Sequence, residues 1–131
     1  MEEYVCNADP KKEIMAVHDA MDVLNGKWKI SVISSICYYN KRRFSDILND
    51  VNGISNKMLS KELKELEINK LIKRTVLETQ PISVQYQLTE YGMTLKTIIN
   101  DLAEWGIKHR QVIIEDMQNR KVKTDPATLS V

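Results

Sequence analysis

The stretch that decides the fold is KRRFSDILNDVNGISNKMLSKELKELEINKLIKRTVLETQPISVQYQLT, residues 41–89. Near its start, Phe44, Ile47 and Val51 recur at helical spacing and predict a short helix with one apolar face. Asn52-Gly53 then supplies a turn, because these two residues tolerate the left-handed backbone that ends a helix. The sequence therefore predicts a short helix that is followed at once by a tight turn.

A longer amphipathic helix is predicted after this turn, from Ser55, a favourable N-cap, to about Asn69. Leu59, Leu63 and Leu66 fall at positions i, i+4 and i+7 and form its apolar face. The opposite face is polar and basic, and it consists of Asn56, Lys57, Ser60, Lys61 and Lys64. Two helices joined by a glycine turn at this spacing are typical of the helix-turn-helix.

Two β-rich segments, Leu71–Glu78 and Ser83–Leu88, follow the helix pair and are separated by the loop Thr79-Gln80-Pro81. They predict a hairpin beside the helix-turn-helix, which is the arrangement of a winged helix. The polar run Asn40–Arg43 is predicted to be only a break between helices. The fold class that we expect is mainly α (α+β), a winged helix-turn-helix domain with a two-stranded wing.

Two helices are predicted ahead of this module. Asp9 can cap the first helix, with Pro10 at its first position, and Asn25-Gly26 ends it. A second helix, rich in apolar residues, is expected over Lys27–Tyr39, with Cys37 buried in it as an inert residue. Residues 1–8 are expected to form a flexible arm.

The last helix is predicted over Glu90–Met117 with Thr89 as its cap, which is far longer than the mean of ~11–12 residues. Its apolar stripe consists of Tyr91, Leu95, Ile98, Leu102, Trp105, His109 and Val112. A small domain cannot cover so much apolar surface, so we expect a partner helix, most simply from a second copy. The domain is predicted to span residues 9–118, and residues 119–131 to form a disordered polar tail.

The composition, with 43% hydrophobic and 28% charged residues, is that of an ordinary globular protein. No apolar run approaches the ~20 residues of a membrane span, and the acidic N-terminus has no signal-peptide core, so we expect a cytoplasmic protein without a membrane partner. Residues 40–75 carry a net charge of +4, and the rest of the chain carries −3. A local basic surface can attract a phosphate backbone, although on charge alone a solvated face is an equal alternative.

Signatures of catalysis or metal binding are missing from the sequence. Cys6 and Cys37 are far apart and form no CxxC pair, and His18 and His109 are isolated, so no set of three or four zinc ligands forms. There is also no glycine-rich phosphate loop, GxSxG or HExxH motif. We therefore predict no enzymatic activity, no metal site and no cofactor.

The basic face of the helix after Gly53 is a candidate recognition surface for double-stranded DNA. Asn56, Lys57 and Ser60, near the start of that helix, are candidates for base contacts, and the other cations for phosphates. The full set of predicted DNA-binding residues is Arg42, Arg43, Ser55, Asn56, Lys57, Ser60, Lys61, Lys64, Lys73, Ser83 and Gln85. The alternative is a solvated face with internal pairs such as Lys61–Glu65.

Cys6 differs from Cys37 because it lies in the predicted arm, close in sequence to Lys11, Lys12 and a helix N-terminus. Positive surroundings lower the pKa of a thiol and favour a thiolate that reacts with oxidants or electrophiles. Cys6 is therefore a candidate redox-sensing residue; the alternative is an incidental free cysteine.

The chain resembles the HxlR family of bacterial winged-helix transcription regulators, which belongs to the MarR-like superfamily. The resemblance rests on the segments Leu24–Lys29 (LNGKWK), Arg43–Ile47 (RFSDI), Gly53–Ser60 (GISNKMLS), Val84–Gly92 (VQYQLTEYG) and Trp105-Gly106. These segments follow the family's order at compatible spacings from about Cys6 to Arg110. They are far more specific than a general winged-helix pattern.

The resemblance implies a homodimer formed by the first and last helices and bound to an inverted-repeat operator. The residues then expected at the dimer interface are Ile14, His18, Ile98, Leu102, Trp105, His109 and Val112. It also implies an electrophile or oxidant as inducer at Cys6. The chain departs from the family pattern at three positions. Asn7 stands where proline is frequent, and Ser83 stands where the wing is often basic. Lys70 replaces a glycine that precedes the wing, so Asn69 is expected to supply the turn.

Two other function classes compete with this prediction. A winged helix without a sensor function can serve as a protein-interaction module, whose basic face binds an acidic partner. An enzyme on the same scaffold is disfavoured because the motifs contain no pair of nucleophile and base.

Overall fold

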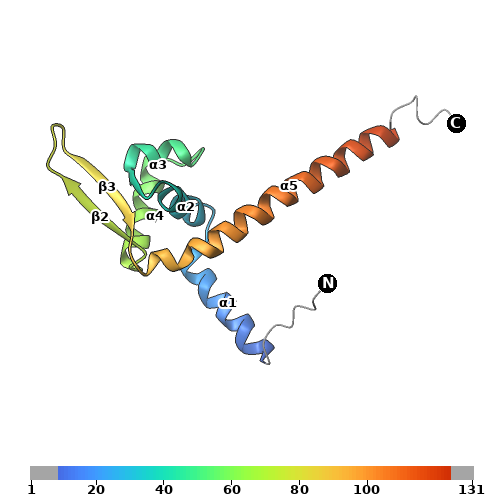
Figure 1. The fold of residues 1–131 in the computed structure, drawn as a ribbon, viewed down its shortest axis with the longest axis horizontal. Coiled ribbons are helices and arrows are strands. Elements are labelled where there is room, and N and C mark those ends of the chain that lie inside the picture. The colour runs from blue at the N-terminus through green and yellow to red at the C-terminus, as the bar shows by residue number, and fades with distance from the viewer. Residues whose placement is uncertain (1–8, 125–131) are drawn as a thin grey trace. The chain divides into compact units, whose positions relative to one another are not determined.

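The computed structural model describes residues 9–124 of the 131-residue chain (Figure 1). Its elements, in order, are α1 (Pro10–Leu24), α2 (Lys29–Tyr39), β1 (Lys41–Arg43), α3 (Phe44–Asp50), α4 (Asn56–Ile68), β2 (Ile72–Leu77), β3 (Ser83–Leu88), the 3-10 helix η1 (Gly92–Leu95) and α5 (Lys96–Thr124). The chain divides into two compact units, Met1–Met93 and Thr94–Val131. The first unit contains the helix-turn-helix and the sheet, as the sequence predicts. No helix in the described range is long and apolar enough to cross a membrane.

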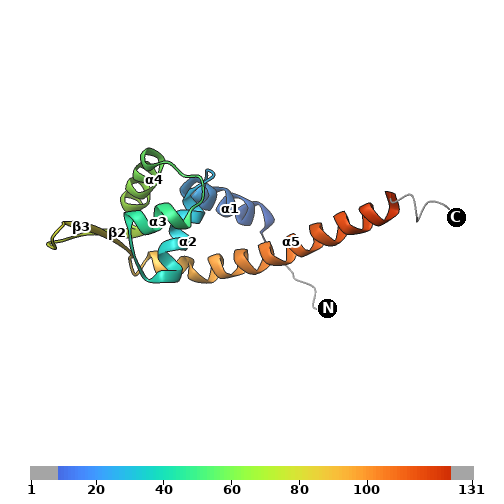
Figure 2. The same ribbon diagram turned by 90° about the horizontal axis from the view of Figure 1, so that it is seen from above.

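The first unit contains one antiparallel sheet with the strand order β1-β3-β2. Strands β2 and β3 form the predicted hairpin, whose far end extends beyond α2, α3 and α4 of the same unit (Figure 2). The prediction that Asn40–Arg43 is only a polar break was wrong, because Lys41–Arg43 forms the edge strand β1 and pairs with Gln85–Gln87. Three residues are too few to show the alternation that indicates a strand.

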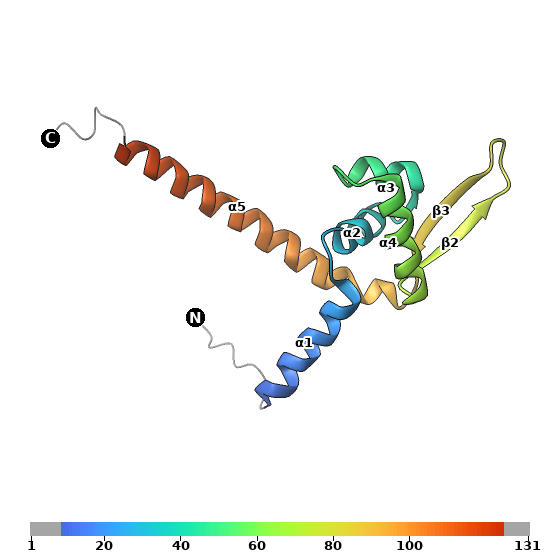
Figure 3. The ribbon, with the colours of Figure 1, turned by 180° about the vertical axis from the view of Figure 1, so that it is seen from behind.

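The core of this unit lies where α2 packs against α3, α4 and β3 (Figure 3). Val32, Ile33 and Ile36 of α2 are fully buried there, as is Ile47 of α3. The predicted apolar face of α4, namely Leu59, Leu63 and Leu66, is buried as expected. The described helices therefore hold α4 by one face and leave its other face to solvent.

The starts of the first two helices follow local rules. The Asp9 carboxylate accepts a hydrogen bond from the Lys12 backbone N–H at 3.3 Å, and Pro10 occupies the first helical position. Gly26, with φ +95°, supplies the left-handed backbone after α1. Helix α2 begins at Lys29, two residues later than predicted. Cys37 was expected to be buried but is only half-buried.

The last helix also differs from its prediction. Thr89 is the expected cap, since its hydroxyl accepts a hydrogen bond from the Gly92 N–H at 2.9 Å and donates to the Lys70 carbonyl at 2.6 Å. However, the first turn is the 3-10 helix η1, and α5 begins only at Lys96. A Cβ on Gly92 would lie 2.0 Å from the Leu71 carbonyl oxygen, so this turn requires glycine.

Helix α5 ends at Thr124, so the prediction that the helix stops at Met117 and that a disordered tail begins at residue 119 was wrong for residues 119–124. An ion pair of 3.1 Å between Arg120 and Asp116, one helical turn apart, supports the extra length. The remaining tail residues, 125–131, lie outside the described range, as do residues 1–8 of the predicted arm.

Candidate nucleic-acid interface

The start of α4 is fixed by Ser55, whose hydroxyl oxygen accepts a hydrogen bond from the Met58 backbone N–H at 3.1 Å. Ser55 is therefore a helix cap, and its role as a DNA contact stays a prediction. All five residues of the predicted polar face of α4 are exposed: Asn56, Lys57, Ser60, Lys61 and Lys64. Neither Lys57 nor Lys64 forms an ion pair with any described residue.

Two acidic residues of α4 are turned away from this face by a lysine of α2. Lys29 and Glu62 are only 7% and 6% exposed, and the Lys29 Nζ lies 2.8 Å from the Glu62 Oε2. Lys29 also forms an ion pair with the partly exposed Glu65. The geometry at Glu62 Oε2 is that of an ion pair rather than a well-aligned hydrogen bond. Lys29 therefore offsets one of these two negative charges, and the Glu62 carboxylate is buried away from the exposed face of α4.

The pKa values of this cluster reflect the pairing. Burial acts to lower the pKa of Lys29, but the contacts of its ammonium with Glu62 and Glu65, and their negative charges, outweigh it and raise the pKa above its ordinary value. The hydrogen bond from Lys29 is the main cause that lowers the pKa of Glu65, and the charge of Lys61 adds to it. Sequence reasoning missed Lys29, although a lysine within a largely apolar helix indicates a buried partner.

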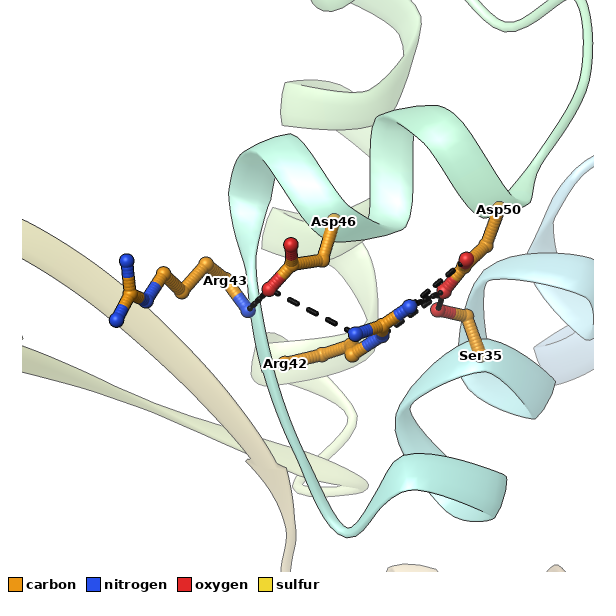
Figure 4. Close-up of polar contacts among 5 residues, drawn as sticks. All are labelled: Ser35, Arg42, Arg43, Asp46 and Asp50. Carbon is orange, nitrogen blue, oxygen red and sulfur yellow. Dashed lines mark hydrogen bonds and ion pairs between the residues drawn. The ribbon is translucent and has the colours of Figure 1, made fainter.

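Arg42 lies at the centre of a second polar cluster, which joins α2, β1 and α3 (Figure 4). Its Nε and Nη2 atoms donate to the two carboxylate oxygens of Asp50 at 2.9 and 2.8 Å. Its Nη1 lies 3.8 Å from an oxygen of Asp46, and its guanidinium stacks over the Tyr39 ring at 3.6 Å. The Ser35 hydroxyl donates to Asp50 at 2.7 Å.

The contacts of this cluster give Arg42 a structural role. A bidentate pair with Asp50 uses the donors that a phosphate would need, so Arg42 positions α3 against α2 and β1. Burial acts to raise the pKa of Asp50, but hydrogen bonds from Ser35 and Arg42 outweigh it and hold the pKa below its ordinary value. Arg43 differs from Arg42, because its side chain points away from the cluster (Figure 4).

The predicted wing residues occupy different positions. Lys73 is exposed on β2, whereas Ser83 and Gln85 of β3 are half-buried. Arg43 of β1 pairs with Gln85 in the sheet, so the structure brings these two candidates together. The loop between β2 and β3 instead exposes an apolar residue, Ile82, with 70% of its surface accessible.

The turn into the wing was predicted incorrectly. Asn69 was expected to supply it, but Lys70 takes the left-handed backbone with φ +64°. Asn69 instead ends α4, where its backbone N–H and its side-chain Nδ2 both donate to the Glu65 carbonyl at 3.0 Å. Lysine therefore occupies a conformation that glycine adopts without strain.

The predicted dimerisation residues are exposed on their own helices. Ile14 of α1 is 68% exposed, and Leu102, Trp105 and Val112 of α5 are about half exposed or more. The Trp105 and His109 rings stack in parallel with their centroids 4.8 Å apart. His18 and Ile98 are exposed as well. Within the described range, no group of three or more potential ligands is placed to hold a metal ion. Cys6 lies outside that range.

The fold and the exposed basic helix define a winged-helix transcription regulator, and comparison with known proteins gives the family. A family model described as HxlR-like helix-turn-helix matches residues 23–113. The HTH-type transcriptional regulator YybR of Bacillus subtilis is 36% identical over 121 residues, which is 89% of this chain and 93% of YybR. The chain belongs to the HxlR family, which confirms the resemblance and makes it a regulator rather than an enzyme.

Solved structures agree with this assignment. The redox regulator HypR in its reduced form aligns with a TM-score of 0.69 and 34% identity, over 76% of this chain and 98% of HypR. A MarR-family regulator from Porphyromonas gingivalis W83 aligns with a TM-score of 0.64 and 30% identity, over 81% of this chain and 97% of that chain. The winged-helix fold and its MarR-like character are thereby confirmed.

Proposed function

We propose that this HxlR-type regulator binds an inverted-repeat DNA operator as a homodimer and reads it with helix α4. The observation that carries the proposal is the asymmetry of α4. Its exposed face holds Lys57, Lys61 and Lys64, while the buried Glu62 and the partly exposed Glu65 are both paired with Lys29. Such a face attracts phosphates and leaves Asn56 and Ser60 at the start of the helix for base edges.

The homodimer is supported by apolar side chains that the described residues leave uncovered. On α1 these include Ile14, Val17 and Met21, and on α5 they include Leu102 and Val112. Exposed apolar surface of this extent on two helices is typical of an interface. Two copies related by a twofold axis would place their α4 helices in major grooves ~34–36 Å apart.

The DNA proposal is tested by the salt dependence of binding to a duplex selected by the protein from a random pool. Each phosphate contact contributes about 0.9 to the slope of log K against log salt concentration. Lys61→Ala should therefore lower the slope by about 1.8 for a dimer and weaken binding to all sequences. Lys11→Ala, on the exposed surface of α1, is the matched control. A protein that binds no duplex, or binds without salt dependence, would contradict the proposal and favour a protein-interaction module.

We further propose that Cys6 senses oxidants or electrophiles. The support is chemical: Lys11, Lys12 and the start of α1 follow Cys6 in the sequence and favour a thiolate. A second support is the likeness to HypR, which is a redox regulator. Oxidation by diamide would join the Cys6 thiolates of the two copies in a disulfide. The two electrons that they give up, together with two protons from water, reduce the N=N bond of diamide to a hydrazine.

Diamide titration of DNA binding tests this second proposal. The unmodified protein should change its affinity for the duplex on treatment, and Cys6→Ser should not respond while its basal affinity stays the same. Cys37→Ser is the matched control, because it removes a half-buried thiol of α2 and should leave the response intact. A Cys6→Ser protein that still responds would remove Cys6 from the account.

A further inference from the structure

The two faces of the three-stranded sheet differ in polarity, and the strand register shows how. Paired residues of antiparallel strands point to the same side of the sheet. Ile72 pairs with Leu88, and Tyr86 pairs with both Arg42 and Arg74. Ile72, Tyr86 and Leu88 are buried, so this side faces the core near the helices, whereas Arg74 and Val76 on the same side are exposed further out. The intervening residues point to the opposite side, where those of β1 and the first two of β2 are exposed and Gln85 and Gln87 of β3 are half-buried.

The solvent-facing side brings together basic residues from both edge strands. Lys41 of β1 and Lys73 of β2 flank Gln87 of β3, and one step along the sheet Arg43 and Thr75 flank Gln85. Lys41, Arg43 and Lys73 are all exposed. With strands ~4.8 Å apart and ~3.3 Å of rise per residue, the Cα atoms of the two lysines are about 10 Å apart and those of Lys41 and Arg43 about 7 Å.

No acidic strand residue occupies this side of the sheet. We call its basal part the basic sheet face: Lys41, Arg43, Lys73, Thr75, Gln85 and Gln87. None of its three cations forms an ion pair with a described residue, whereas Arg42, on the opposite side, is paired with Asp50. The side chain of Arg43 extends away from that cluster (Figure 4). Three unpaired like charges on neighbouring positions repel one another and favour an anionic partner.

We propose that the basic sheet face is a second phosphate-binding surface for the DNA backbone, in which Lys41 is a contact that sequence reasoning did not assign. The inference rests on the proposed DNA binding. Gln85 and Gln87 lie between the cations and can donate amide hydrogen bonds to phosphate oxygens. The wing would then bind DNA through its base and not its tip, because residues 77–84 include neither lysine nor arginine.

The salt slope of binding to the selected duplex tests this surface directly. Lys41→Gln and Lys73→Gln should each lower the slope by about 1.8 per dimer, and the double variant by about 3.6. Arg74→Gln is the matched control, because Arg74 neighbours Lys73 on β2 but points to the other side and should leave the slope unchanged. Lys41→Arg retains the charge and should keep the slope of the unmodified protein.

The outcomes separate the two proposals. If Lys61→Ala lowers the slope but Lys41→Gln and Lys73→Gln do not, α4 binds DNA and the inference about the sheet is wrong. That result would favour an acidic protein, not DNA, as the partner of the basic sheet face. If Arg74→Gln lowers the slope as much as Lys73→Gln does, the assignment to one face is overturned. A folded protein with no salt-dependent binding at all would refute the proposed function itself.

Discussion

Replacing Lys29 by methionine should destabilise the first unit strongly, although methionine fits an apolar helix and lysine carries a charge. Lys29 and Glu62 are both more than nine-tenths buried and lie 2.8 Å apart. Removing one partner of a buried ion pair leaves the other as an uncompensated charge, at a cost of about 3–5 kcal/mol. The side chain of Glu65 is 38% exposed, so its lost pair adds little. The expected fall in Tm is roughly 12–40 °C, because 1 kcal/mol shifts the Tm of a unit of this size by about 4–8 °C.

The pH dependence of stability provides an independent check. The pKa values of Asp50 and Glu65 are lowered in the folded protein, so both carboxylates contribute stability near neutral pH that is lost as pH falls below the ordinary carboxyl range. The lowered pKa of Glu65 depends mainly on its hydrogen bond from Lys29. Lys29→Met should therefore lose less stability on acidification than the unmodified protein does.

Urea unfolding followed by circular dichroism, at one protein concentration for all variants, measures these free energies. Lys64→Met is the matched control, since it replaces an exposed lysine of α4 and should change the stability by less than about 0.5 kcal/mol. The double variant Lys29→Met, Glu62→Leu removes the orphaned carboxylate and should recover more than half of the loss. The buried ion pair would not have this role if the unfolding free energy of Lys29→Met lay within about 1 kcal/mol of that of the unmodified protein. It would also not have this role if the double variant recovered none of the loss.

Three further predictions concern other parts of the fold. Arg42→Ala should lower the free energy of unfolding, measured in urea, by about 2 kcal/mol, because Asp50 loses two charge-assisted hydrogen bonds. The same change at the exposed Arg43 should lower it by less than about 0.5 kcal/mol, and equal losses would contradict the positioning role of Arg42. Lys70→Gly should stabilise the protein by about 0.5–1 kcal/mol, since φ is +64° there, and Lys70→Ala should give no gain. Leu102→Glu should yield a monomer by light scattering if α5 forms the dimer interface; an unchanged dimer would exclude this residue from it.

Local patterns were sufficient to predict most of the first unit. The apolar spacing of Leu59, Leu63 and Leu66 gave the orientation of α4, and Ser55 gave its start. The edge strand β1 escaped prediction because a strand of three charged residues has neither length nor apolar alternation. Its existence depends on pairing with β3, which is 42 or more residues further along the chain.

The candidate site was predicted as a set of residue types but not as an arrangement. Arg42 and Arg43 are adjacent and chemically alike, yet strand alternation sends one to Asp50 and the other to the opposite side of the sheet. The pairing of Lys29 with Glu62 joins residues on two different helices, and no local pattern contains it. Charge counts along the sequence therefore located the basic region but could not say which cations remain free.

The mass of the complex between this protein and its selected duplex, measured by light scattering, decides whether two copies bind one operator through α4. We predict two 15.2 kDa chains per duplex, and loss of the complex at moderate salt when Lys61 and Lys64 are both replaced by alanine. One chain per duplex, or a complex of the double variant with the same stability in salt, would contradict it.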